Sequence, residues 1–220
     1  MQRSAPPGRN NHEPTASAIR FVVEQAGFAV RVTAILLAIA VGIMSGLSLT
    51  WIASAGALGF GTVKIGAWTA WPKSGTPDAD PYSRALYARS GELPLGSTDG
   101  IAFAAASDDN GTALNGRCEI HIAGRMPAAR FWTLTVYDAQ GRLIENAGAR
   151  HGYTSAEVLW KSDNEVEIVL APRARSGNWI PTGNRERISA VLRFYDAPIG
   201  LTGRSANAVE LPAVWQEFCP

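Results

Sequence analysis

FWTLTVYD, residues 131–138, is the stretch of sequence that decides the fold class of this chain. Every second residue is a large apolar one (Trp132, Leu134 and Val136), and the positions between them carry mostly threonine and tyrosine. Successive side chains of a strand point to opposite faces. The alternation therefore predicts a strand with one face in a core.

Similar runs lie on both sides of this strand, separated by turn signals. The sequence Asp108-Asp109-Asn110-Gly111 is typical of a hairpin turn, because Asn-Gly adopts the backbone conformation that tight hairpins require. Several short strands at this spacing predict a mainly β protein, either an antiparallel sandwich or a barrel. The other predicted strands are Ile101–Ser107, Arg117–Ile122, Leu143–Asn146, Val166–Leu170 and Ile188–Asp196.

One short helix is predicted before the first of these strands. Asp80 is a favoured residue for capping a helix N-terminus, and Pro81 is a favoured first helical residue. Gly91 is a typical residue for ending a helix. These three positions predict a helix over about residues 81–90.

The N-terminal part of the chain contains a run without any charged side chain, from Val32 to Val63. A helix needs roughly 20 apolar residues to cross a hydrocarbon core of about 30 Å. Residues 32–53 meet that length, and Arg31 and Trp51 lie where membrane-interface residues are expected. The run predicts a transmembrane helix that anchors the protein to a membrane by a single span.

The charges beside this span predict its direction. Residues 1–31 contain four arginines and two glutamates, a net charge of +2. Positive flanks favour the cytoplasmic side, so the N-terminus is expected in the cytoplasm of a bacterial cell. The chain from about residue 64 is then expected in the periplasm, with the anchor in the inner membrane.

Cleavage of this segment is an alternative. Ala53-Ser54-Ala55 has the small-x-small pattern of a signal-peptidase site after an apolar core. The 31 residues before the core are long for a signal peptide, which favours an anchor that is retained.

Three small residues, Ala38, Gly42 and Gly46, lie four positions apart within the span. This spacing places them on one helix face and lets two helix backbones approach closely. It supports the hypothesis of a helix-mediated homodimer. The alternative is that glycine and alanine are simply common in membrane helices.

These features divide the chain into four expected parts. Residues 1–31 form a cytoplasmic tail and an amphipathic lead-in, and residues 32–53 form the transmembrane helix. Residues 54–79 form a Pro/Gly-containing connector, and residues 80–220 form a periplasmic β-sandwich domain. The net charge of the whole chain is only +1, which gives no electrostatic footprint for nucleic acid.

Four segments stand in an order that resembles a known family. They read PAARFWTLTVYDAQGRL (127–143), VEIVLAP (166–172), SGNWIPT (176–182) and AVLRFYDAP (190–198). Together they are similar to the bacterial domain of unknown function 1214, in its short, membrane-anchored type, over roughly residues 95–200. The resemblance implies a compact, jelly-roll-like antiparallel β-sandwich and no family-wide reaction, and it assigns no catalytic residue. The chain departs from the family at Asp163-Asn164-Glu165, where an Asp-Gly turn is expected.

The two cysteines, Cys118 and Cys219, both lie in the part predicted to be exported, where disulfides form. A bridge between them would tie the C-terminal segment to the sheet. The alternative is one buried thiol and one free thiol. The three histidines show no metal-ligand spacing, and the chain has no phosphate-binding, dinucleotide or hydrolase motif. The sequence therefore predicts no metal site and no cofactor.

Polar side chains on alternate strand positions form the candidate binding site. In a sandwich they could line one polar face that binds a glycan or another envelope polymer, with aromatic rings giving apolar contact. Ordinary solvated strand faces are the alternative. Glu119 and Glu167 could also act as an acid–base pair for glycan cleavage. The residues of this face are Glu119, His121, Thr133, Thr135, Tyr137, Glu167 and Arg193.

Asn178, Trp179 and Pro181 are expected to form a structural turn. In this turn Trp179 would plug the end of the sandwich, and Asn178 would bond to backbone groups. An exposed Trp179 that contacts a ligand is the alternative.

The sequence as a whole favours an envelope binding or interaction module that is not an enzyme. The alternative is a hydrolase or lyase that acts on an envelope glycan. A deep pocket that unites His121 with the two glutamates would favour the enzyme, and a flat face would favour the interaction module.

Overall fold

The structure is a computed structural model of the chain, and it describes residues 16–54, 61–90, 93–96, 99–199 and 209–219. The chain divides into two compact units, Met1–Ile52 and Ala53–Pro220. The predicted tail at residues 1–14, the Ala55 end of the cleavage pattern and the helix stop at Gly91 lie outside the described residues.

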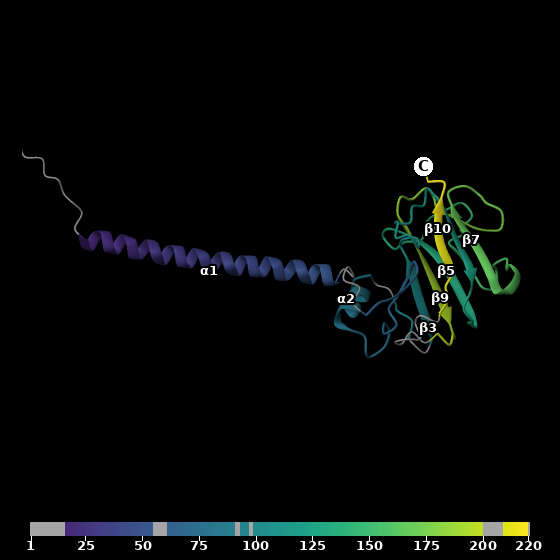
Figure 1. Cartoon of the computed structure of the whole chain (residues 1–220), viewed down its shortest axis with the longest axis horizontal. Coiled ribbons are helices and arrows are strands. Elements are labelled where there is room, and N and C mark those ends of the chain that lie inside the picture. Colours follow the sequence, from purple (N-terminus) through teal and green to yellow (C-terminus); the bar gives the residue numbers. More distant parts are fainter. Residues whose placement is uncertain (1–15, 55–60, 91–92, 97–98, 200–208, 220) are drawn as a thin grey trace, which may run out of the picture. The chain divides into compact units, whose positions relative to one another are not determined.

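Helix α1 (Ala16–Ser54) is continuous through the predicted lead-in and the predicted span (Figure 1). Its segment Val30–Ala53 has a mean hydropathy of 2.3 and is long and apolar enough to cross a membrane. The hydroxyl of Ser45 donates a hydrogen bond to the Val41 carbonyl at 2.7 Å. Such bonding to the preceding turn satisfies a polar side chain where no water is available.

In the described part of the second unit, one α-helix, the short 3-10 helix η1 (Ser162–Asn164) and two sheets are present (Figure 1). The α-helix is α2 (Pro81–Ser90). The six-stranded sheet has the order β1-β2-β3-β9-β5-β6, with β1 Val63–Ile65, β2 Trp68–Ala70, β3 Gly100–Ala105, β9 Ile188–Tyr195, β5 Phe131–Asp138 and β6 Gly152–Thr154. The four-stranded sheet has the order β10-β4-β7-β8, with β10 Ala213–Glu217, β4 Glu119–Arg125, β7 Glu165–Ala171 and β8 Asn178–Pro181.

The inner faces of the two sheets share one hydrophobic core. Phe103, Leu134 and Leu192 from the first sheet are fully buried, as are Ile120 and Leu170 from the second. Strands β3, β4 and β5 alternate between the sheets, and β9 inserts between β3 and β5. The predicted fold class is therefore confirmed: the chain is mainly β, with two packed sheets, one N-terminal apolar helix and one short helix.

Strand β5 has the bounds predicted from its alternation, and Trp132, Leu134 and Val136 are buried. The helix α2 also begins where predicted. Its cap is formed by Asp80, whose carboxylate accepts hydrogen bonds from the backbone N–H groups of Tyr82 (2.9 Å) and Ser83 (3.0 Å).

Three details of the sheets differ from the sequence prediction. Strands β7 and β8 pair in parallel, so the second sheet is mixed rather than antiparallel. The predicted strand Leu143–Asn146 is absent from the described residues apart from one bridge, between Tyr137 and Leu143. Strands β1 and β2 lie within the predicted connector, where the buried indole of Trp68 donates to the Pro212 carbonyl at 2.7 Å.

The prediction of a structural turn at Asn178, Trp179 and Pro181 is wrong, because these residues form strand β8. Parallel pairing with β7 makes the backbone of these residues part of the four-stranded sheet. Trp179 is half-buried, and its indole donates to the carbonyl of Ala171 at 3.0 Å. Its backbone N–H donates to the Tyr153 hydroxyl at 3.2 Å, which links an edge strand of one sheet to an edge strand of the other.

The hairpin before β7 shows how the chain turns without the Asp-Gly pair. Asp163 and Asn164 both adopt left-handed backbone conformations, with φ angles of 58° and 63°. Asp and Asn tolerate this region better than other residues with a side chain. The Asn164 side chain also donates to the Met126 carbonyl at 2.8 Å, which holds the turn against the end of β4.

A disulfide joins Cys118 to Cys219 across 101 residues of sequence. Cys118 lies directly before β4, and Cys219 follows β10. Because β10 pairs with β4, both cysteines lie at the same end of this strand pair, and the bridge joins the two strands there.

Candidate functional site

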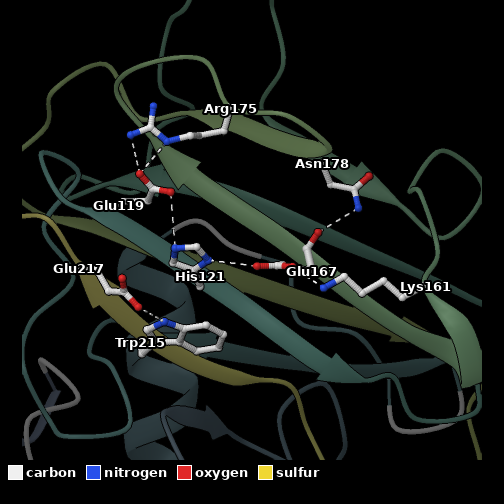
Figure 2. Close-up of polar contacts among 8 residues, drawn as sticks. All are labelled: Glu119, His121, Lys161, Glu167, Arg175, Asn178, Trp215 and Glu217. Atoms are coloured by element: carbon white, nitrogen blue, oxygen red, sulfur yellow. Dashed lines mark hydrogen bonds and ion pairs between the residues drawn. The ribbon is translucent and has the colours of Figure 1, made fainter.

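The outward face of the four-stranded sheet carries a cluster of ionisable side chains, drawn in Figure 2. Glu119 and His121 stand at alternate positions of β4, and Glu167 stands on β7. Ile120, which lies between Glu119 and His121 on β4, points into the core. Ile168, which follows Glu167 on β7, also points into the core. The two-residue period of the strands therefore places all three polar side chains on one face.

His121 lies between the two carboxylates (Figure 2). Its Nδ1 atom is 3.2 Å from the Glu167 Oε1 atom, and its Nε2 atom is 3.5 Å from the Glu119 Oε1 atom. The His121 side chain is only 15% exposed and that of Glu119 only 12%. A neutral imidazole donates to one carboxylate, and a protonated one donates to both.

Each carboxylate is also paired with a cation on its far side. Arg175 donates a hydrogen bond from Nε to the Glu119 Oε2 atom (2.6 Å), and its Nη2 atom forms an ion pair with the same oxygen at 2.5 Å. Lys161 donates to the Oε2 atom of Glu167. The resulting chain is cation, carboxylate, imidazole, carboxylate, cation, and its net charge is zero when His121 is neutral.

These contacts lower the pKa values of both carboxyl groups. The hydrogen bond from Arg175 is the main cause for Glu119, and the same bond raises the pKa of Arg175. The hydrogen bond from Lys161 is the main cause for Glu167, followed in the same direction by the bond from His121. Both carboxyl groups are therefore ionised at neutral pH.

A tryptophan from the C-terminal strand covers the imidazole. Trp215 of β10 is paired with His121 of β4 in the sheet register. Their rings are stacked, with centroids 5.0 Å apart and planes within 7° of parallel. The indole N–H donates to the Glu217 carboxylate at 2.8 Å, which fixes the ring's orientation (Figure 2).

The cluster lines a pocket of about 350 Å³. Trp160, which is 41% exposed, and Leu159, which is 65% exposed, add apolar surface to its wall. Asn178 holds this wall in place. Its side chain accepts from the Leu159 N–H at 2.7 Å and donates to the backbone carbonyls of Leu159 and Glu167, both at 2.9 Å.

The side-chain atoms of the cluster that could ligate a metal ion do not converge on one point. The two imidazole nitrogens of His121 face different carboxylates, Glu119 and Glu167, on opposite sides of the ring. Among the residues that the structure describes, no group of three or more His, Cys, Asp or Glu side chains could hold a metal ion. The arrangement presents fixed hydrogen-bonding groups beside an apolar wall.

The structure divides the predicted polar face into two parts. Glu119, His121 and Glu167 lie together on the four-stranded sheet. The remaining predicted residues lie on the six-stranded sheet, whose outward face points away from the cluster because the core separates the sheets. The prediction of one common face is therefore wrong. The residues on the other sheet are Thr133, Thr135, Tyr137 and Arg193.

Three residues of the cluster were not predicted from the sequence. Arg175 lies in the loop between β7 and β8, and Lys161 lies in the loop before β7. Neither position has a periodic pattern that would indicate its direction. Trp215 could have been found, since Val214 and Trp215 begin a short apolar–polar strand pattern next to Cys219.

Comparison with known proteins identifies the domain but no activity. Residues 99–199 match the family described as "Protein of unknown function (DUF1214)". No curated protein matches the chain. The prediction made from the four ordered segments is confirmed by the family match.

Two solved structures resemble the fold. The first is the VPA0106 protein from Vibrio parahaemolyticus, with 18% identity and a TM-score of 0.52, covering 64% of this chain and 36% of that one. The second is an uncharacterised protein from Burkholderia cenocepacia, with 16% identity and a TM-score of 0.43, covering 77% of this chain and 39% of that one. This chain thus spans little more than a third of the length of either protein. The first likeness supports the fold alone, and the segment from residue 99 to residue 199 matches the DUF1214 family.

Proposed function

We propose that the protein is a single-span membrane protein of the bacterial inner membrane, and that its exported domain binds an envelope glycan in the pocket of the four-stranded sheet. The N-terminus lies in the cytoplasm, since the net charge of residues 1–31 is +2 and positive flanks stay inside. The disulfide between Cys118 and Cys219 supports the periplasm, because such bonds persist in oxidising compartments.

The observation that carries the binding proposal is the position of His121 between Glu119 and Glu167 inside a pocket. The pocket volume of about 350 Å³ is near the lower end of the range for small-ligand sites, about 300–1,000 Å³. Fixed carboxylates, an imidazole and two cations offer both donors and acceptors to sugar hydroxyls. The exposed ring of Trp160 offers the apolar surface on which a sugar ring can pack.

A hydrolase or lyase is the second candidate, because one pocket unites His121 with both glutamates. Glycoside cleavage needs a carboxylic acid that still carries its proton at the working pH. The pKa values of Glu119 and Glu167 are instead both lowered by their cations. These lowered pKa values favour binding over cleavage.

A binding assay with a parallel turnover assay tests this choice. The full chain in lipid nanodiscs is titrated with soluble peptidoglycan fragments, and release of new reducing ends is followed in the same samples. Binding without turnover, reduced at least tenfold by Glu167→Gln and by Trp160→Ala, supports the proposal. Arg130→Gln is the matched control, because this arginine is 82% exposed and lies outside the pocket.

Two results would overturn the binding proposal. Turnover that disappears in Glu119→Gln would establish the enzyme instead. The absence of both binding and turnover with peptidoglycan fragments would refute the proposal that the pocket binds an envelope glycan.

We also propose that Ala38, Gly42 and Gly46 support a helix-mediated homodimer. Beside Gly42 and Gly46, an added methyl group would meet no described atom within 4 Å, apart from the adjoining residues and the nearby backbone of the same helix. Close helix contact of this kind is lost when a large side chain replaces glycine. Self-association that is unchanged by Gly42→Ile in a membrane reporter assay would refute the dimer.

A further inference from the structure

A second hollow lies on the outward face of the six-stranded sheet. Its volume is about 510 Å³, larger than that of the pocket around His121. Three aromatic rings line it, those of Trp71, Tyr87 and Tyr137. Arg193 of β9 is the single charged side chain among the described residues that line it.

Short side chains on neighbouring strands create this hollow. Ala102 and Ala104 of β3 and Ser189 of β9 point outward, because Phe103 and Ala190 at neighbouring strand positions are buried. Because the side chains at these positions are short, they leave an open space above the sheet. The segment after β2 and the segment around Leu95, which also line the hollow, supply larger residues at its border.

Arg193 has room for an anion. It is half-buried, and it donates to the Tyr137 hydroxyl at 3.3 Å, with its guanidinium 5.8 Å from the centre of the Tyr137 ring. None of the ion pairs among the described residues includes Arg193. A guanidinium has five N–H donors, so most of its donors remain for another acceptor.

The rest of the hollow determines what kind of anion fits. Ala102, Ala104 and Val191 on its floor offer no side-chain hydrogen bonds, and the nearby walls carry the rings of Trp71 and Tyr87. A sugar would leave the hydroxyl groups that face these three side chains unsatisfied, at a cost in binding free energy. An apolar body with one negative charge matches both the floor and the cation.

We propose that this hollow binds a small, water-soluble carboxylate with an apolar body. The Arg193 guanidinium holds the carboxylate in a charge-assisted hydrogen bond, next to the Tyr137 hydroxyl. The rings of Trp71 and Tyr87 contact the apolar body. This site is separate from the glycan pocket, because it lies on the other sheet and shares no lining residue with it.

Titration of the full chain in lipid nanodiscs with 4-phenylbutyrate tests the proposal, with binding measured by calorimetry and by Trp fluorescence. The neutral 4-phenylbutan-1-ol and the cationic 4-phenylbutylamine have the same apolar body. The carboxylate is expected to bind at least tenfold more tightly than either. Titration of empty nanodiscs measures partition into lipid.

Two variants examine the two halves of the site. Arg193→Gln is expected to weaken 4-phenylbutyrate binding at least tenfold, whereas Arg130→Gln, an exposed arginine outside the hollow, leaves it unchanged. Ala102→Leu keeps the cation and fills the floor, so it is also expected to weaken binding at least tenfold. Because it leaves Arg193 in place, it still tests the site if Arg193→Gln lowers the melting temperature.

The proposal is overturned if the alcohol binds as tightly as the carboxylate, or if both variants bind like the unmodified chain. It is also overturned if empty nanodiscs account for all the heat. Glu167→Gln is expected to leave 4-phenylbutyrate binding unchanged, which separates this test from that of the glycan pocket.

Discussion

Removal of the Cys118–Cys219 disulfide is expected to lower the stability of the domain substantially. The bridge closes a loop with a sequence separation of 101 residues. In the chain-entropy model a loop of this length contributes about 4.7 kcal/mol, as an upper estimate. For a domain of this size each kcal/mol corresponds to about 2–4 °C in melting temperature, so Cys219→Ala is expected to lower it by about 9–19 °C.

Thermal melts of the full chain test this value, with and without reductant. Cys219 is replaced in preference to Cys118 because Cys118 is fully buried and its replacement would also disturb the core. Reductant is expected to lower the melting temperature of the unmodified chain and to have no effect on the variant. Equal melts of the unmodified chain in both conditions would refute the reasoning. Equal masses after alkylation, with and without reductant, would show that no bridge exists.

Three further predictions concern the ionisable cluster around His121, the close contact between Gly152 and Leu134, and the N-cap of α2. The folded pKa values of Glu119 and Glu167 lie below the ordinary 4.5, so their stabilisation is present above that pH and is lost as the pH falls through the folded values. The double Gln variant should therefore show a flatter dependence of melting temperature on pH below 4.5. In Gly152→Ala the new methyl carbon would overlap the Leu134 carbonyl oxygen, so urea unfolding should show a loss of about 2 kcal/mol or more in the free energy of unfolding. Asp80→Ala removes the cap of α2 and should cost about 1 kcal/mol in the same assay, and an unchanged midpoint would contradict the cap.

The sequence predicted best where a regular period met a single buried face. Strand β5 has one face in the core, so its alternation was sufficient to give its bounds. The helix α2 was equally clear, because Asp80 and Pro81 mark its start by local chemistry. Such signals depend only on neighbours in the sequence.

The failures share a physical reason, since they depend on strand pairing and on contacts between segments, which no local sequence pattern records. Strand β8 becomes a strand only through pairing with β7, although its Asn-Trp-Ile-Pro sequence is typical of a turn. The outward residues of β4 and β5 were assigned to one face because the alternation gives a direction within each strand and not the sheet that holds it. The loop position of Arg175 had no period at all to indicate that it contacts Glu119.

The place of β9 in the first sheet has a consequence for the folding kinetics. This strand lies between β3 and β5, yet it follows β3 by more than 80 residues in the chain. Until β9 arrives, the facing edges of β3 and β5 have unpaired backbone groups beside apolar side chains such as Phe103 and Leu134. Long-range pairing of this kind gives folding times of about milliseconds to seconds, and open edges promote aggregation. Because a chain is synthesised from its N-terminus onward, β3 and β5 are exposed to aggregation until β9 has been made.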